Sequence, residues 1–229
     1  MFKEAANPFI AGPSRPLSFR TTFGDGVSGW VDRLRGHIRP VHVESLQALL
    51  AAVDAKDQYT RKHSITVAAY CDAIGRRMTQ TPSSLSTLRV AALLHDVGKI
   101  GIPDSILNKP GPLDTDERCV VQRHPQIAID ILGSMRFLTN HRPIILHHHE
   151  RYDGKGYPSG LRGEQIPLGA RILAVADAID TMLSSRTYKK ACTLDDVRAE
   201  LIRSSGNHFD PHIVGIALDW MDSWPEKGA

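Results

Sequence analysis

Histidine and aspartate side chains recur along this chain in a pattern that suits metal ligation. The candidate ligands are His95, Asp96, His124, His148, His149 and Asp177. Neutral imidazoles and ionised carboxylates are ligands that divalent transition metals accept in proteins, provided that rigid elements hold them. The chemistry indicated by these residue types is therefore that of a metal centre. For the run His147 to His149, the competing interpretation is a solvated basic patch at a helix end.

Apolar segments border these candidates and would position them. Residues 89–95 predict a buried helix that delivers His95 and Asp96 at its carboxyl end. Gly98 and Pro103 then end that helix, which leaves Lys99 close to the pair. Asp177 lies within the apolar run 172–180, where an unpaired carboxylate would cost several kcal/mol or stay protonated. A bound metal ion removes that cost.

The wider pattern is helical from residue 41 onward. Apolar residues at three- and four-residue spacing predict helices over 45–53, 63–78, 144–149, 170–183, 194–203 and 211–220. Thr81 and Asp210 are predicted to cap helices, and residues 114–117 and His124 to open two more. No alternating strand pattern is present. The sequence predicts an all-α fold, a compact bundle.

The first 40 residues differ from the rest. Pro and Gly punctuate them without a sustained period, which predicts a tail or linker. Residues 41–229 then form the one substantial domain that this length allows.

Several motifs together resemble those of the HD-GYP family. They are HDVGKIGIP from His95, HP at His124, HHERYDGKGYP from His148 and ADAID from Ala176. The resemblance runs from about residue 51 to about residue 214. It implies an HD-type helical bundle with a GYP substrate loop, a metal centre and cyclic di-GMP phosphodiesterase activity.

The resemblance also implies a set of ligands. The minimal HD metal site would consist of His63, His95, Asp96 and Asp177. His124, His148 and His149 add three imidazoles, too many for the same ion once water positions stay open, so we expect a second ion, with Asp96 bridging the two. Tyr59 replaces a glutamate that helps some family members to hold a third metal, which favours two divalent transition metals. The family match suggests Fe or Mn, although these ligands would also accept Zn or Ni.

Two divalent cations with only two carboxylate ligands keep a net positive charge, which would attract a phosphodiester. A water acidified between the metals is expected to attack phosphorus in line, while the metals and Lys99 take up the developing charge. Asp96 and Lys99 are thus the predicted catalytic residues. The sequence does not identify the donor that protonates the leaving oxygen.

Residues predicted to contact substrate lie around the centre. Gly156 and Tyr157 follow the histidine pair, where the tyrosine could stack on a purine and the glycine could let the backbone approach a phosphate. Lys99 is also predicted to contact the substrate. Arg186 and Lys189 match family residues that contact substrate phosphates, and a solvated basic turn is the alternative.

Two further carboxylates are predicted to support the site from behind. Asp180 lies one turn beyond Asp177, where it can accept a hydrogen bond from the far nitrogen of a ligand imidazole. Asp57 precedes His63 and is expected to play a similar part or to face substrate.

Composition limits the classes of function and the cellular location that the sequence allows. A net charge of +3 without a dense basic stripe gives no case for binding a nucleic-acid polymer. No apolar stretch approaches the roughly 20 residues that span a bilayer. Three widely spaced cysteines suit a reducing compartment, so we expect a cytoplasmic protein.

Three functional hypotheses follow. The first is an enzyme that converts cyclic di-GMP to pGpG, with GMP as a further product. The second is a catalytically weak cyclic di-GMP sensor that binds a partner, such as a diguanylate cyclase domain. The third keeps the chemistry but acts on another cyclic dinucleotide, such as cyclic GMP-AMP. All the expected ligands are present, which favours an enzyme. A regulatory partner and a homodimer are left open.

Overall fold

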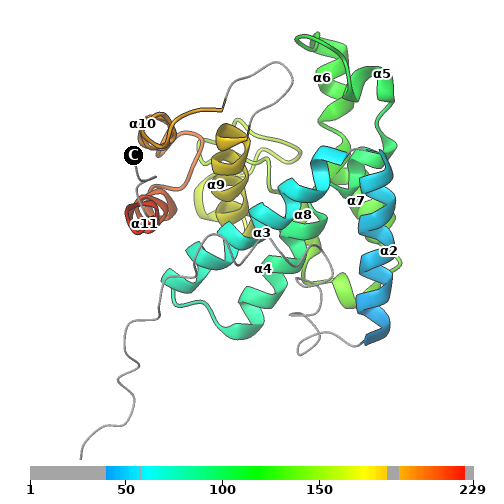
Figure 1. Cartoon of the computed structure of the whole chain (residues 1–229), viewed down its shortest axis with the longest axis horizontal. Helices are drawn as coiled ribbons and strands as arrows, with labels where there is room; N and C mark the ends of the chain where they lie inside the picture. The colour runs from blue at the N-terminus through cyan, green and yellow to red at the C-terminus, as the bar shows by residue number, and fades with distance from the viewer. Residues whose placement is uncertain (1–39, 57, 185–190, 225–229) are drawn as a thin grey trace, which may run out of the picture.

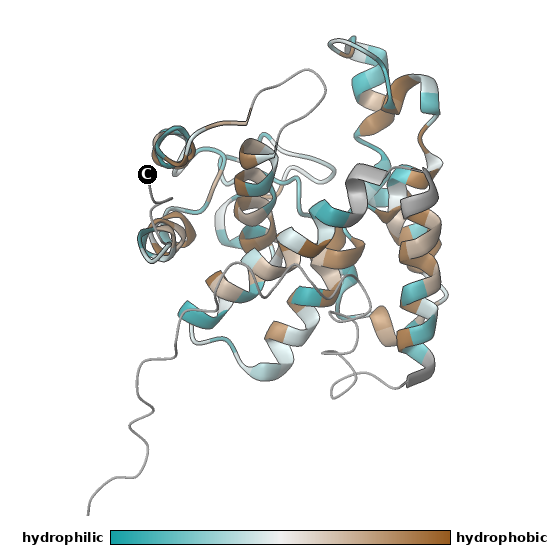
Figure 2. Cartoon of the chain, in the orientation of Figure 1, coloured by the Kyte–Doolittle hydropathy of each residue, from teal (hydrophilic) through white to brown (hydrophobic). Residues whose placement is uncertain are grey.

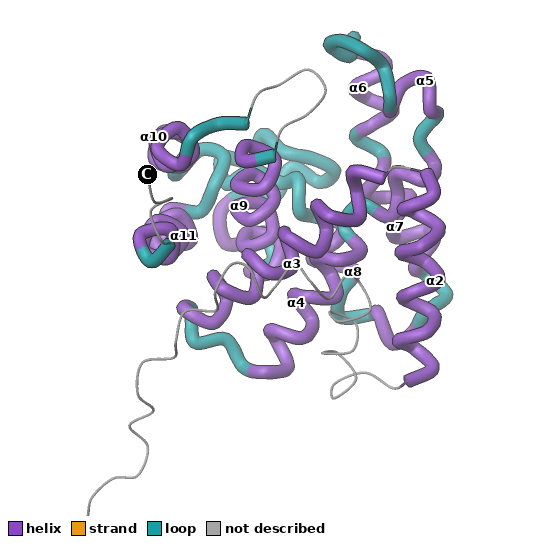
Figure 3. The backbone as a smooth tube through the Cα atoms, viewed as in Figure 1, coloured by secondary structure: helices purple, strands orange, loops and turns teal. Residues whose placement is uncertain are grey.

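The computed structural model describes residues 40–56, 58–184 and 191–224, and it contains no strand within them. Figure 3 shows helices joined by loops, and a bridge between Ser205 and Phe209 is isolated. The predicted all-α class is confirmed. The α-helices are α2 (Pro40–Lys56), α3 (Gln58–Arg77), α4 (Pro82–Leu94), α5 (Asp104–Leu107), α6 (Thr115–Val121), α7 (His124–Leu132), α8 (Arg142–Leu146), α9 (Leu168–Leu183), α10 (Leu194–Ser204) and α11 (Pro211–Asp222). Three short 3-10 helices are η1 (Val97–Gly101), η2 (Arg136–Leu138) and η3 (Gly163–Gln165).

Helix α3 lies at the middle of the bundle and packs against both α4 and α9 (Figure 1). The apolar run of α4 is buried from Val90 to Leu94, and α9 buries Ile172, Leu173 and Ile179. Figure 2 shows much of α9 in the brown of hydrophobic residues. Each fully buried Leu or Ile contributes about 1.5–3 kcal/mol, so these helices form a rigid frame for side chains at their ends.

Helix starts follow the capping residues seen in the sequence. Thr81 accepts a hydrogen bond from the Ser84 amide at the start of α4, and Asp210 accepts one from His212 at the start of α11. Asp114 and Glu117 form a reciprocal capping box at α6. The predicted caps at Thr81 and Asp210 are confirmed.

One predicted helix is wrong at its carboxyl end. The pattern predicts helix over 144–149, whereas α8 ends at Leu146 and leaves His147, His148 and His149 in a turn. Successive residues of an α-helix point about 100° apart, because 3.6 residues complete a turn. Leaving the helix allows His148 and His149 to face the same place.

The C-terminal helices are joined to α9 by a charged pair. Arg171 of α9 donates to the Asp210 carboxylate, which also caps α11, and to the carbonyl of Ile166. Both charged side chains are largely buried. Asp210 therefore fixes the position of the turn that precedes α11.

His141 precedes α8, and its burial makes stability depend on pH. Burial lowers the pKa of its imidazole from 6.5 to about 4, against the opposing effect of the Leu138 carbonyl. The unfolded chain takes up a proton near pH 6.5 and the folded chain only near pH 4, so the free energy of unfolding falls as the pH drops through this window. Between about pH 7.5 and about pH 5, the free energy of unfolding of the metal-free wild type should fall. The fall in a His141→Leu variant should be smaller by about 2 kcal/mol. Urea unfolding at both pH values measures this, and equal losses would contradict it.

The predicted tail falls on residues outside the described part of the chain, so the boundary near residue 40 stays a prediction. Among the helices that the structure describes, none has the length and apolar character needed to cross a membrane.

Candidate metal centre

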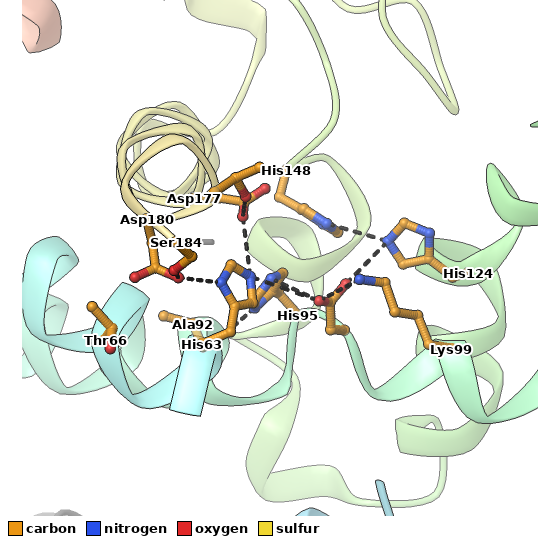
Figure 4. A network of polar contacts seen from close by, with 12 residues as sticks. His63, Thr66, Ala92, His95, Lys99, His124, His148, Asp177, Asp180 and Ser184 are labelled. Atoms are coloured by element: carbon orange, nitrogen blue, oxygen red, sulfur yellow. Dashed lines mark hydrogen bonds and ion pairs between the residues drawn. The ribbon is translucent and has the colours of Figure 1, made fainter. Parts of the chain in front are cut away.

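Five helical segments bring the seven predicted ligands to one place. His63 comes from α3, Asp177 from α9, and His148 and His149 from the turn after α8. The other ligands are His95 and Asp96 between α4 and η1, and His124 at the first residue of α7. Figure 4 shows His63 beside His95 and Asp177, while His124 is turned toward His148.

The ligand atoms fall into two neighbouring groups joined by a third. His63, His95 and Asp177 form one group, and His124, His148 and His149 form the other. The joining group consists of His95, Asp96 and His148. Within each group, the ligand atoms lie within 4.8 Å of one another, which is close enough to surround a single cation.

The Asp96 carboxylate is buried between the two groups. Its Oδ2 lies 3.4 Å from Nε2 of His95 and 3.9 Å from Nε2 of His63. Its Oδ1 lies 3.7 Å from Nε2 of His124. One oxygen thus faces each group, which is the arrangement that a bridging carboxylate requires.

Three imidazoles are held in a defined tautomer. Nδ1 of His95, His124 and His148 lies 2.7, 2.8 and 2.7 Å from the carbonyl oxygen three residues earlier in each case. A carbonyl can only accept, so Nδ1 carries the proton and the lone pair of Nε2 points into the centre.

This arrangement leaves two acceptors facing each other, which tests whether the residues suit a metal. Nε2 of His124 lies 3.4 Å from Nε2 of His148. Burial lowers the pKa of His124 to about 4 and that of His148 well below its ordinary value, so both rings are neutral. Two buried lone pairs without a proton between them are unfavourable. A cation would satisfy both, so the residues fit a metal site.

His63 differs from these neutral imidazoles, because each of its two ring nitrogens faces a carboxylate. Its Nε2 is 3.1 Å from Asp177 and its Nδ1 is 2.6 Å from Asp180. Burial lowers the pKa of His63, but the hydrogen bonds and charges of these carboxylates outweigh it and raise the pKa to about 10. Burial likewise opposes ionisation of Asp177, yet its hydrogen bond with His63 holds its pKa well below the usual range. A metal ligated by His63 and Asp177 would replace the proton that they share.

An Asp180→Ala variant should weaken metal binding about 10- to 100-fold, because the His63 ring would lose the acceptor that orients it. Competition with a chelator measures the affinity. Asp219→Ala is the matched control, since Asp219 is an exposed carboxylate on α11. Equal affinities in the two variants would show that Asp180 does not orient the ligand.

Gly98 sets the distance between two ligand-bearing segments. A Cβ atom at this position would lie 1.9 Å from the carbonyl oxygen of His124 and 2.6 Å from the amide nitrogen of Ala128. The backbone of η1 therefore rests directly on the first turn of α7. The sequence pattern indicated only that Gly98 ends a helix, but the contact shows that glycine is what lets Asp96 approach His124.

The remaining predicted residues are placed as follows. Nζ of Lys99 lies 2.7 Å from Oδ2 of Asp96, as the pattern suggested. The Tyr157 ring stacks on the His149 ring, with centroids 4.9 Å apart and 29° between planes. Gly156 packs on the backbone of the preceding turn. The substrate contacts of Lys99, Gly156 and Tyr157 stay predictions. Asp57, Arg186 and Lys189 lie outside the described residues.

Sequence reasoning missed Glu150, which directly follows His149 and is only 2% exposed. Its carboxylate accepts hydrogen bonds from the backbone amides of Ser159 and Leu161. An acidic residue next to two candidate ligands was the available signal, but its position alone does not reveal burial.

Comparison with known proteins agrees with this geometry. The model of a family described as HD domain matches residues 46–213. The cyclic di-GMP phosphodiesterase response regulator RpfG of Xanthomonas campestris pv. campestris is 44% identical over 177 residues, which cover 76% of this chain and 47% of the relative. The 3'3'-cGAMP-specific phosphodiesterase 2 of Vibrio cholerae is 37% identical over 189 residues, covering 82% of this chain and 36% of the relative. The chain thus spans less than half the length of either relative.

A solved structure shows the same fold. An HDG"Y"P protein from Bdellovibrio bacteriovorus superposes with a TM-score of 0.63 at 17% identity, over 84% of this chain and 68% of that one. The family model covers most of the chain and includes all seven of the clustered residues. The chain therefore belongs to the HD domain family, and its motifs place it among the HD-GYP proteins of that family.

Proposed function

We propose that this chain is a metal-dependent phosphodiesterase that hydrolyses cyclic di-GMP to pGpG, with GMP as a further product. The observation that carries the proposal is the buried Asp96 carboxylate, whose two oxygens face two separate groups of histidine and aspartate ligands. The relative from Xanthomonas, named as a cyclic di-GMP phosphodiesterase, supports this choice of substrate.

The two groups would each hold one divalent cation, with Fe or Mn proposed. His63, His95 and Asp177 would hold one ion, and His124, His148 and His149 the other, with Asp96 shared. When bound, such ions supply Lewis acidity and an acidified water. The protein's own contribution is to keep the imidazoles neutral, through burial of His124, His148 and His149.

Other side chains would bind and orient the substrate. Lys99 contacts Asp96 and is about a quarter exposed (26%), so its positive charge lies at the edge of the buried centre, where an anionic phosphodiester would arrive. Tyr157 covers His149 with one face of its ring and would stack a guanine on the other. Arg186 and Lys189 are proposed to bind phosphate.

A second substrate is favoured by one specific finding. The Vibrio relative is named as specific for 3'3'-cGAMP and is 37% identical to this chain. Both cyclic dinucleotides carry the same phosphodiester linkage pattern and at least one guanine, so the metal centre would serve either. The base pocket would then decide between them.

The test is hydrolysis by protein purified without oxygen and reconstituted with Fe(II) or Mn(II), with metal content per chain measured on the same sample. Cyclic di-GMP and 3'3'-cGAMP are compared as substrates, and pGpG and GMP are separated as products. Turnover of cyclic di-GMP with about two metals per chain supports the proposal. Preference for 3'3'-cGAMP would move the chain to the second substrate. Tight nucleotide binding by the metal-loaded protein without turnover would replace the enzyme with a sensor.

A further inference from the structure

Glu150 is a buried carboxylate that closes the loop following the histidine pair. Its side chain has no exposed surface. One oxygen accepts a hydrogen bond from the amide of Ser159 at 2.6 Å, and the other from the amide of Leu161 at 3.1 Å. Burying an acidic group is costly unless hydrogen bonds compensate it. The two amides supply that compensation, and in return they are fixed in position.

The segment enclosed by these bonds lies directly on the end of the ligand turn. A Cβ atom on Gly156 would lie 2.3 Å from the amide nitrogen of Arg151 and 2.5 Å from Cα of Glu150. The two backbones are therefore in contact without an intervening side chain. Tyr157 follows at once, and its amide donates to the carbonyl of His149 at 3.3 Å. This register places the Tyr157 ring on the His149 imidazole.

The outer arm of the same loop is held from another side. The amide of Asp153 donates to the carbonyl of Asn207 at 2.8 Å. The amide of Tyr152 donates to the carbonyl of His208 at 3.1 Å. The turn before α11 thus fixes the beginning of the loop. Its return past Tyr157 is held by the Glu150 carboxylate at Ser159 and Leu161.

We propose that Glu150 is a positioning residue of the centre, which clamps the returning arm of the loop and so holds Tyr157 against His149. Glu150 belongs to neither ligand group, so its proposed action is through the amides of Ser159 and Leu161. The structural part of the proposal stands on the hydrogen bonds and the ring stack. The effect on nucleotide binding rests on the proposed function.

Limited proteolysis tests the structural part without any activity assay. Lys155 and Arg162 are exposed trypsin sites within the loop. Glu150→Ala should speed cleavage after them at least about tenfold, because local opening controls access to the protease. Glu150→Gln keeps the side-chain volume and one acceptor oxygen, so it should give an intermediate rate. Glu164→Gln, an exposed carboxylate on η3, is the control and should match wild type.

Circular dichroism and cleavage rates elsewhere show whether each variant is folded. If Glu150→Ala fails to fold, Glu150→Gln decides the question, since it removes one hydrogen bond with little change in packing. Loop cleavage at the wild-type rate in the folded Glu150→Gln variant would then overturn the clamp, as it would in a folded Glu150→Ala variant.

A double-mutant cycle tests whether Glu150 acts through Tyr157. With Mn(II)-loaded protein and cyclic di-GMP, Glu150→Ala should raise the dissociation constant about tenfold when Tyr157 is present. It should add little in a Tyr157→Ala background, because the effect has already been lost. Full additivity would overturn the positioning role. If wild type neither binds nor hydrolyses a cyclic dinucleotide, the proposed function fails, and the proteolysis still decides whether Glu150 holds the loop.

Discussion

An Asp96→Ala variant is expected to retain little or no bound metal and to lose turnover of cyclic di-GMP by at least about a thousandfold. The substitution removes the oxygen that faces His63 and His95, and with it the oxygen that faces His124. Both ligand groups would therefore lose a partner at once. Metal content per chain and initial rates on the same preparation measure the two losses.

The control for this variant is Asp219→Ala, which removes an exposed carboxylate of the same type from α11. It should keep wild-type metal content and rate. Circular dichroism of metal-free Asp96→Ala should show a folded helical protein, so that loss of metal is not loss of fold. A folded Asp96→Ala protein that keeps two metals and more than about a tenth of the wild-type rate would refute a shared carboxylate.

A Gly98→Ala variant is expected to lower the free energy of unfolding by about 2–4 kcal/mol and to weaken metal binding. The added methyl group would meet backbone atoms of His124 and Ala128, which cannot turn away as a side chain can. Relief requires η1 to move from α7, and this movement separates Asp96 from His124. Urea unfolding of metal-free protein and chelator competition measure the two effects.

Gly215→Ala provides a matched control, because Gly215 lies within α11 and a Cβ atom there would meet nothing within 4 Å. Alanine is favoured over glycine in a helix, so this variant should be more stable by about 0.5–1 kcal/mol. A Gly98→Ala protein as stable as wild type would mean that the close approach of η1 and α7 is not required.

Much of the site was predictable from the sequence because its ligands interrupt apolar periods. Asp177 stands in a buried run, where only a strong partner makes a carboxylate tolerable, and His95 follows the continuously apolar stretch Val90–Leu94 that ends α4. The motifs of the HD-GYP family then related these residues to His63, which a local pattern could not single out. The helix caps at Thr81 and Asp210 were predictable for a similar reason, since capping depends on residues that are neighbours in sequence.

The contacts between distant segments were not predictable in this way. Nothing in the residues around Gly98 shows that the first turn of α7 will rest on it. The early end of α8 at Leu146 was missed because His147 to His149 continue a plausible helical pattern. Glu150 reads as a solvated acid until the loop folds over it. In each case, tertiary contact overrides the local preference.

Two carboxylates of α9, those of Asp177 and Asp180, flank His63, and Asp180 lies 117 residues after His63 in the sequence. During synthesis, the residues His63, His95, His124, His148 and His149 are all added to the chain before α9 is begun. A nascent chain at that stage has imidazoles but lacks the aspartate that completes their first group. The complete first group therefore exists only once α9 has packed against α3, so metal loading at that group must follow this packing.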